Sequence, residues 1–95
     1  MKFEWNLLKA DLNLNNKHKV SFKEAATVFG DWYALTFDDP DHSQYEDRFI
    51  ILGFSNQGRL LVVSYTYRNE QVRVISARKA DKKERRFYEK KNRQK

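Results

Sequence analysis

Three closely spaced stretches of β-branched and aromatic residues constrain the fold more than any other feature of the sequence. They occupy residues 48–54 (RFIILGF), 60–67 (LLVVSYTY) and 72–77 (VRVISA), and each has the composition of a β-strand. The first link, 56–58 (NQG), has the length of a hairpin loop, and the second, 68–71 (RNEQ), is a short polar break. Because such short links join only antiparallel neighbours, the three stretches predict an antiparallel meander.

The residues before the meander predict a short strand and two helices. Residues 3–5 alternate between apolar and polar side chains, and leucines then recur at near-helical spacing through about residue 15. Ser21 with Glu24 three positions later forms a capping-box pattern, and the apolar stripe behind it stops at Gly30. A second helix is therefore expected between Ser21 and Gly30.

A further strand and a C-terminal helix complete the predicted order β-α-α-β-β-β-β-α. Residues 32–37 (WYALTF) read as the strand, which 38–41 (DDPD) end in a turn. We expect a single α+β domain over residues 1–95, with an antiparallel sheet of about four strands, the short N-terminal strand and helices on one face. Because LLVV and IIL are apolar at successive positions, two arrangements remain open: helices cover part of both faces, or one face is an apolar-aromatic platform.

The C-terminal segment has few apolar side chains. Asp81 and Glu84 stand at capping-box spacing, and Phe87 and Tyr88 are the aromatic residues available to anchor the following helix to a core. We expect this basic helix to fray into a basic tail over residues 90–95.

Charge is distributed unevenly along the chain. Residues 68–95 hold 12 of the 19 Lys and Arg and 4 of the 13 Asp and Glu, a balance of +8, whereas residues 1–67 hold 7 and 9, a balance of −2. A cationic end attracts polyanions, which makes nucleic acid the leading class of partner. A charged helix that lysines keep soluble explains the same charge, and charge alone does not separate these interpretations.

Several classes of chemistry lack their sequence requirements. Cysteine is absent, which removes disulfides, thiolate nucleophiles and cysteine-ligated zinc, and no GxxxxGK[ST], GxGxxG, HExxH or serine-elbow pattern occurs. The first residues, MKFEWNLLKA, contain acids and no continuous apolar stretch. We therefore expect a cytoplasmic protein without a cofactor or a membrane partner. Phosphate chemistry carried out by Arg, Lys and His remains.

A histidine flanked by two lysines follows the first predicted helix. His18 can act as a general base on a 2′-hydroxyl, while Lys17 and Lys19 hold phosphate. A histidine that complements the dipole at a helix C-terminus is the alternative.

Arginines stand at strand ends, where side chains from different strands converge. Arg48 begins a strand and Arg78 ends one, followed by Lys79, while Arg73 lies within a strand. Guanidinium forks bind phosphate bidentately and stabilise the extra charge of a phosphorane. For Arg73 the favoured interpretation is an ion pair with an acidic residue, which is worth little at a surface.

Two tyrosines and an acidic segment permit functional interpretations as well. Tyr65 and Tyr67 share a face with Leu61 and Val63 and can stack RNA bases, although packing at a core edge is the favoured interpretation. The segment 38–47 contains several carboxylates and His42. Its spacing matches no metal-binding loop, so we expect a turn that holds basic groups of the same chain, and no metal.

The strings KHKVSFKEAATVFGD, LTFDDPDHS, EDRFIILGFS, GRLLVVSYTYR and VRVISARKADKKERRFYE together closely resemble the BrnT family of type II toxins. The resemblance covers roughly residues 3–89, and the ordered patterns KHxVSFxEA, DDPDHS and RxxIxxARxAxxxER are specific. It implies a RelE-like α+β fold and a ribonuclease activity that arrests growth. It also implies neutralisation by a BrnA-type ribbon-helix-helix antitoxin, in a complex that represses its own promoter DNA through the antitoxin.

Matching positions carry over residue by residue. The resemblance implies phosphate binding and stabilisation of transition-state charge for Arg48 and Arg78, and binding or proton transfer for Lys17 or His18. It adds RNA contacts by Arg85 and Arg86 in the C-terminal helix.

This chain departs from the family pattern around its KH pair. Lys19 stands where the family usually has glycine, and the interval from Trp5 to His18 is one residue longer than usual, so we expect a reshaped helix exit. Two alternatives to a ribonuclease remain open: a nucleic-acid-binding module without catalysis, and a scaffold whose basic face holds the antitoxin.

Overall fold

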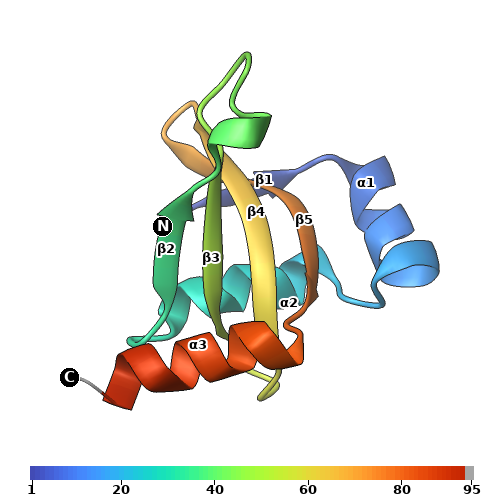
Figure 1. Ribbon diagram of the computed structural model, residues 1–95. Helices are drawn as coiled ribbons and strands as arrows, with labels where there is room; N and C mark the ends of the chain where they lie inside the picture. The colour runs from blue at the N-terminus through green and yellow to red at the C-terminus, as the bar shows by residue number, and fades with distance from the viewer. Residues whose placement is uncertain (94–95) are drawn as a thin grey trace.

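A computed structural model describes residues 1–93, apart from the side chain of Lys17, and shows a five-stranded sheet with helices on both faces (Figure 1). The elements in chain order are β1 (Phe3–Trp5), α1 (Leu7–Leu12), the π-helical η1 (Asn13–Lys17), α2 (Phe22–Ala26), the 3-10 helix η2 (Thr27–Gly30), β2 (Leu35–Asp38), the 3-10 helix η3 (Pro40–His42), β3 (Phe49–Phe54), β4 (Leu60–Arg68), β5 (Gln71–Lys79) and α3 (Lys82–Arg93). This order confirms the mixed α+β class predicted from the sequence.

The predicted meander forms the centre of the sheet. The strand order is β1-β5-β4-β3-β2, and all neighbouring pairs are antiparallel except β1, which runs parallel to β5. Between β4 and β5, Asn69 and Glu70 have φ of 54° and 62°, the two left-handed residues of the tight hairpin turn that matches strand twist. Gly58, with φ of 76°, closes the other hairpin.

The strand predicted at 32–37 begins later than expected. It starts at Leu35, because Asp31 folds the preceding residues into a turn: its side chain accepts the N–H of Tyr33 at 2.9 Å and its carbonyl accepts that of Ala34 at 3.1 Å. An aspartate that bonds to the backbone two residues on competes with the sheet. Trp32 is consequently 94% exposed.

The capping-box prediction is confirmed for the C-terminal helix. The N–H of Glu84 donates to Asp81 at 2.8 Å, and the N–H of Asp81 donates to Glu84 at 2.9 Å. The helix continues through Arg93, whereas the sequence predicted a frayed tail from residue 90. Residues 94 and 95 lie outside the described part of the chain.

The face of the sheet covered by α2 carries the larger core. Its fully buried members come from both helical and strand segments, and partly buried rings such as Phe3 and Phe29 close its edge. The buried residues are Val20, Phe22, Ala25, Val28, Ile51, Leu61, Val63, Tyr65, Val72, Val74 and Ala77.

The opposite face has a smaller core, centred on Leu52, Leu60, Val62 and Tyr88. Figure 1 shows α3 lying across one end of this face, in front of the strands, while α2 lies behind them. The expectation of helices on one face is therefore wrong, and the alternative, partial cover of both faces, is confirmed. Within residues 1–93 no helix has the length and apolar character needed to cross a membrane.

Candidate functional site

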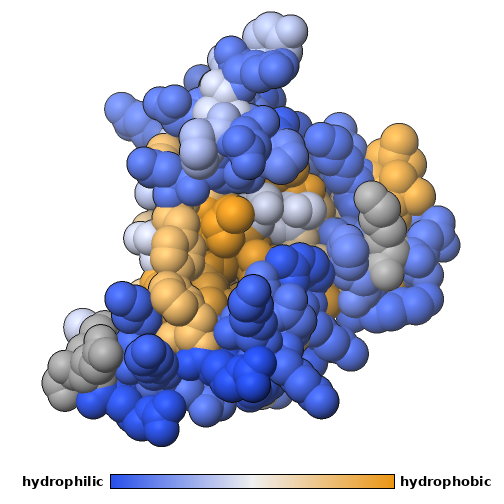
Figure 2. Space-filling view, viewed as in Figure 1, coloured by the Kyte–Doolittle hydropathy of each residue, from blue (hydrophilic) through white to orange (hydrophobic). Residues whose placement is uncertain are grey.

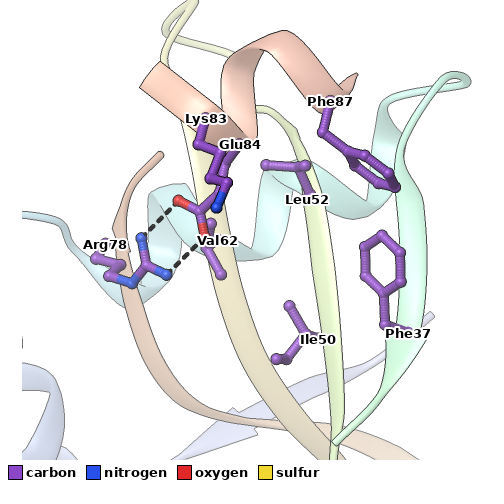
Figure 3. A pocket seen from close by; sticks show the side chains of 8 residues that line it. All are labelled: Phe37, Ile50, Leu52, Val62, Arg78, Lys83, Glu84 and Phe87. Carbon is purple, nitrogen blue, oxygen red and sulfur yellow. Dashed lines mark hydrogen bonds and ion pairs between the residues drawn. The ribbon is translucent and has the colours of Figure 1, made fainter. Parts of the chain in front are cut away.

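A hollow of about 380 Å³ lies on the face of the sheet that α3 covers only in part. Figure 2 shows it as an apolar depression between hydrophilic side chains above and below. The residues that line it are Phe37, Ile50, Leu52, Val62, Arg78, Lys83, Glu84 and Phe87. Figure 3 shows the two phenylalanine rings on one side, the Arg78–Glu84 pair on the other, and the aliphatic side chains between them.

Strand register explains how these residues meet. Leu52 pairs with Val62, and Val62 pairs with Arg78, and directly opposed residues of a sheet project from the same face. Phe37 is brought beside Ile50 in the same way. Each strand thus contributes to the hollow only those alternate residues whose side chains point to this face.

Arg78 is held at the rim of the hollow by a bidentate contact. Its two terminal nitrogens donate to the carboxylate oxygens of Glu84 at 2.8 and 2.7 Å, and one of them also donates to the carbonyl of Lys79 at 3.3 Å. The hydrogen bonds with Arg78 lower the pKa of Glu84, and the same contact raises the pKa of Arg78. Because a guanidinium has five N–H donors and its side chain is 42% exposed, Arg78 keeps donors for a ligand.

The role of Glu84 was only half predicted. Its capping-box position was read from the sequence, but its ion pair with Arg78 was not. A signal existed, because a carboxylate in the first turn of a helix that begins just after a strand-ending arginine lies within reach of that arginine.

A second hollow, of about 310 Å³, lies beside α1 and η1 and contains His18. Its other lining residues are Lys9, Leu12, Asn13, Asn16, Ile75 and Ser76. Ser76 pairs with Ser64, which in turn pairs with Ile50 of the first hollow, so Ser76 and Arg78 project from the same face of β5. The hollow that contains His18 therefore lies against the C-terminal half of β5, which also carries Arg78.

Asn13 fixes the chain around His18. Its carbonyl accepts the N–H groups of His18 and Lys19 at 3.1 and 3.0 Å. Its buried amide donates to the carbonyls of Val20 and Ala77 at 2.8 Å each. No motif in the sequence pointed to this asparagine.

The helix exit has an unusual backbone. The bond from His18 to Asn13 spans five residues, the pattern of a π-helix, which accommodates one more residue than an α-helical turn. Lys19 has φ of 59°, in the left-handed region that glycine adopts at lowest cost. The prediction for Lys17 concerns a side chain outside the described residues.

Arg48 occupies a different place from Arg78. Its Nε lies 3.7 Å from Glu46, whose carboxylate also accepts from Arg68 at 3.2 Å. It lines hollows formed with the loop that contains η3, not the hollow beside α3. The acidic segment therefore does hold basic groups of the same chain, as expected, and the two arginines predicted to act together line separate hollows.

The two tyrosines considered as a base-stacking platform, Tyr65 and Tyr67, lie on the face of the sheet that α2 covers. Tyr65 is 4% exposed and packs edge-on against Phe29 at 4.9 Å between ring centres, so the prediction that it stacks bases is wrong for Tyr65. Burial raises its pKa to about 12. Tyr67 is exposed at the same edge, 5.7 Å from Phe49. Both tyrosines match the interpretation of packing at a core edge.

The remaining predicted RNA-binding residues are basic side chains that line neither of the two hollows. Arg73 pairs with Glu4 of β1 at 3.4 Å, which is the ion pair expected for it, with a partner in the first strand. Arg85 lies over the ring of Phe54 at 5.9 Å. Lys79, Arg85 and Arg86 are exposed.

The cluster of carboxylates near η3 bonds internally. His42 Nδ1 lies 3.0 Å from a carboxylate oxygen of Asp39, and Ser43 donates to the carbonyl of the same residue at 2.7 Å. In the described part of the chain, no three His, Asp or Glu side chains converge in the manner of a metal site.

Comparison with known proteins gives a matching family model and a similar solved structure. A family model described as the ribonuclease toxin BrnT of type II toxin-antitoxin systems matches residues 5–84. The crystal structure of the Brucella abortus ribonuclease toxin BrnT is similar to this structure with a TM-score of 0.64 at 22% identity, over 86% of this chain and 99% of that chain. No curated protein sequence matches significantly.

Proposed function

The chain belongs to the BrnT family of ribonuclease toxins of type II toxin-antitoxin systems, and we propose that it is an endoribonuclease that arrests translation and growth in the cytoplasm. The observation that carries this proposal is the guanidinium of Arg78, held in a bidentate contact and still partly exposed at the rim of a hollow on the sheet face. The mostly antiparallel sheet and the similarity to a solved BrnT toxin support assignment to the RelE-like group.

The proposed reaction uses the RNA's own 2′-hydroxyl and no metal ion. The 2′-oxygen attacks the adjacent phosphorus, its proton passes to a base, and the bond from phosphorus to the 5′-oxygen breaks as that oxygen takes up a proton. The products are a 2′,3′-cyclic phosphate and a 5′-hydroxyl. Such a step needs positioning, proton transfer and stabilisation of the phosphorane charge.

The residues divide these tasks by position. Arg78 stabilises the phosphorane with the N–H donors that Glu84 leaves free, because charge-assisted bonds to a planar fork suit phosphate oxygens. His18 transfers a proton and Lys17 holds phosphate from the side of η1. Arg48 binds a phosphate further along the RNA, since it lies in a separate hollow, and Lys19, Lys79, Arg73, Tyr67, Arg85 and Arg86 extend the contact.

Cleavage of RNA by the purified protein tests the proposal. We expect Arg78→Ala to lower the rate about 100-fold or more, the loss typical of removing one transition-state donor, and His18→Ala to lower it within the 100-fold to 10,000-fold range of general acid–base catalysis. Lys23→Ala, at an exposed position on α2, is the matched control and keeps full activity. Equal cleavage by the wild type and Arg78→Ala would contradict this role of Arg78.

A binding module without catalysis is the second candidate, and the separation of Arg48 from Arg78 favours it. In that case the purified protein binds RNA and leaves it intact, while expression in cells still arrests growth. Primer extension on RNA from cells that express the chain separates the two candidates.

The proposal includes an antitoxin of the BrnA-type ribbon-helix-helix class, which would also connect the complex to promoter DNA. Membership of a type II toxin family supports an antitoxin partner, and the basic α3 favours an acidic contact surface. Co-purification with the product of a neighbouring reading frame, followed by loss of growth arrest on co-expression, tests this part. A scaffold that only holds the antitoxin predicts no growth arrest by the free chain.

A further inference from the structure

We propose that the hollow beside α3 binds one unstacked nucleobase of single-stranded RNA, next to the phosphate held by Arg78. The inference rests on the proposed ribonuclease function and names the part of the substrate that this hollow takes. It is carried by the shape and chemistry of the lining residues, which form an apolar recess with Arg78 and Lys83 at its margin.

The wall of the hollow offers aromatic surface that the core does not use. Phe37 and Phe87 are 39% and 38% exposed, and their ring centres lie 5.8 Å apart. A monomeric fold usually buries rings of this size, and half-exposed aromatic pairs in a concavity are typical of ligand sites. Bases stack on such rings because every base has a π-face.

The floor and the rim divide recognition between them. Ile50, Leu52 and Val62 form an aliphatic floor without polar side-chain atoms (Figure 3), so a base is held by its faces and not by its edges. Arg78 and Lys83 lie at the rim, where the phosphates on either side of an inserted base would come. The apolar centre and cationic margin thus match the two parts of a nucleotide.

Size favours one base over a larger occupant. The volume of about 380 Å³ lies at the low end of the range for small-molecule sites, and Glu84 is already neutralised by Arg78. Because the floor lacks hydrogen-bonding groups, we expect modest base preference, with purines favoured by their larger stacking surface.

Binding of non-cleavable RNA tests the proposal directly. The probes are fluorescein-labelled 2′-O-methyl oligoadenylate, 2′-O-methyl oligouridylate and an abasic strand of the same length, titrated with the purified full chain. We expect Phe87→Leu and Phe37→Leu to weaken oligoadenylate binding about fivefold or more, to weaken oligouridylate less, and to leave the abasic strand unaffected. Phe87→Trp keeps the π-surface and restores binding.

Trp32→Leu is the matched control, because Trp32 is an exposed aromatic outside this hollow, and it leaves all affinities unchanged. Thermal unfolding of each variant verifies the fold. Unchanged oligoadenylate affinity in both leucine variants, an equal loss on the abasic strand, or no binding by the wild type would overturn the proposal. If the leucine variants weaken antitoxin binding and not RNA binding, the hollow is a protein-binding surface. Cleavage that still depends on Arg78 in any of these cases leaves the ribonuclease proposal standing.

Discussion

The two faces of the sheet use similar residues for different purposes. The face under α2 buries its aromatic rings among themselves, with Phe29 and Tyr65 in edge contact inside a closed core. The face under α3 leaves Phe37 and Phe87 half exposed around a hollow. We infer that stability resides mainly on the first face and ligand binding on the second.

Ion pairs differ between the faces in the same way. On the α2 face, Glu24 is buried and accepts from both Arg59 and Ser55, which joins α2 to the β3–β4 hairpin. On the α3 face, Arg78 and Glu84 form a similar fork at a solvent-exposed rim. Loss of one partner from a buried ion pair leaves the other charge buried and unpaired, which is costly. An exposed ion pair is worth little, so a ligand easily replaces one of its partners.

The largest effect that separates the faces is expected from the α2 core. Phe22 is 2% exposed, and Phe22→Ala should lower the free energy of unfolding by about 3–5 kcal/mol through lost burial and the cavity left behind. Phe87→Ala should cost about 1 kcal/mol, because much of that ring is already in water. Urea unfolding measures both, and similar losses from the two variants would contradict the division of roles.

The buried carboxylate gives the next largest effect and a pH dependence. Hydrogen bonds from Arg59 and Ser55 lower the pKa of Glu24 below 4.5 despite its burial. A lowered folded-state pKa means that this stabilisation is complete above the unfolded pKa and is lost as pH falls through the folded value. Glu24→Gln weakens charge-assisted hydrogen bonds and should therefore cost about 2 kcal/mol at neutral pH and flatten the loss of stability below about pH 4.5.

Urea unfolding across this pH range provides the measurement. Glu70→Gln, at an exposed turn position between β4 and β5, serves as the control and should leave the curve unchanged. A Glu24→Gln curve parallel to that of the wild type would show that the Glu24–Arg59 pair does not link folding to pH.

A smaller effect on stability, with a larger one on activity, is expected at Asn13. Asn13→Ala leaves the carbonyls of Val20 and Ala77 without their side-chain donor, at a cost of about 1–2 kcal/mol. Because the lost side-chain bond to Val20 holds the segment that follows His18, the rate of RNA cleavage and its pH profile should change as well. Gln57→Ala, at an exposed position in the loop between β3 and β4, is the control. Loss of stability with an unchanged pH profile would limit Asn13 to a structural role.

The sequence predicted those parts of the structure that depend on residues close together in the chain. The meander and the Asp81–Glu84 cap were predicted because alternation and capping act within a few residues. The start of β2 was missed because the Asp31 turn competes with strand propensity, and the pairing of Phe37 with Phe87 was missed because it joins distant segments. Local patterns therefore identified Arg78 as a candidate and did not identify the hollow beside it.

The smallest expected change in stability, and the sharpest test of the difference between faces, comes from Glu84→Gln. The variant keeps one hydrogen-bond acceptor for Arg78 and loses the charge, and because Arg78 is 42% exposed the cost should stay below about 1 kcal/mol. The guanidinium, no longer held by a carboxylate, should bind RNA more tightly, which the same 2′-O-methyl oligonucleotides measure. Glu89→Gln removes one negative charge from an exposed position on α3 and controls for the general change in charge. An equal gain in RNA affinity in both variants would mean that Glu84 and phosphate do not compete for Arg78. A gain confined to Glu84→Gln would show that the Arg78–Glu84 contact on the α3 face is exchanged for phosphate.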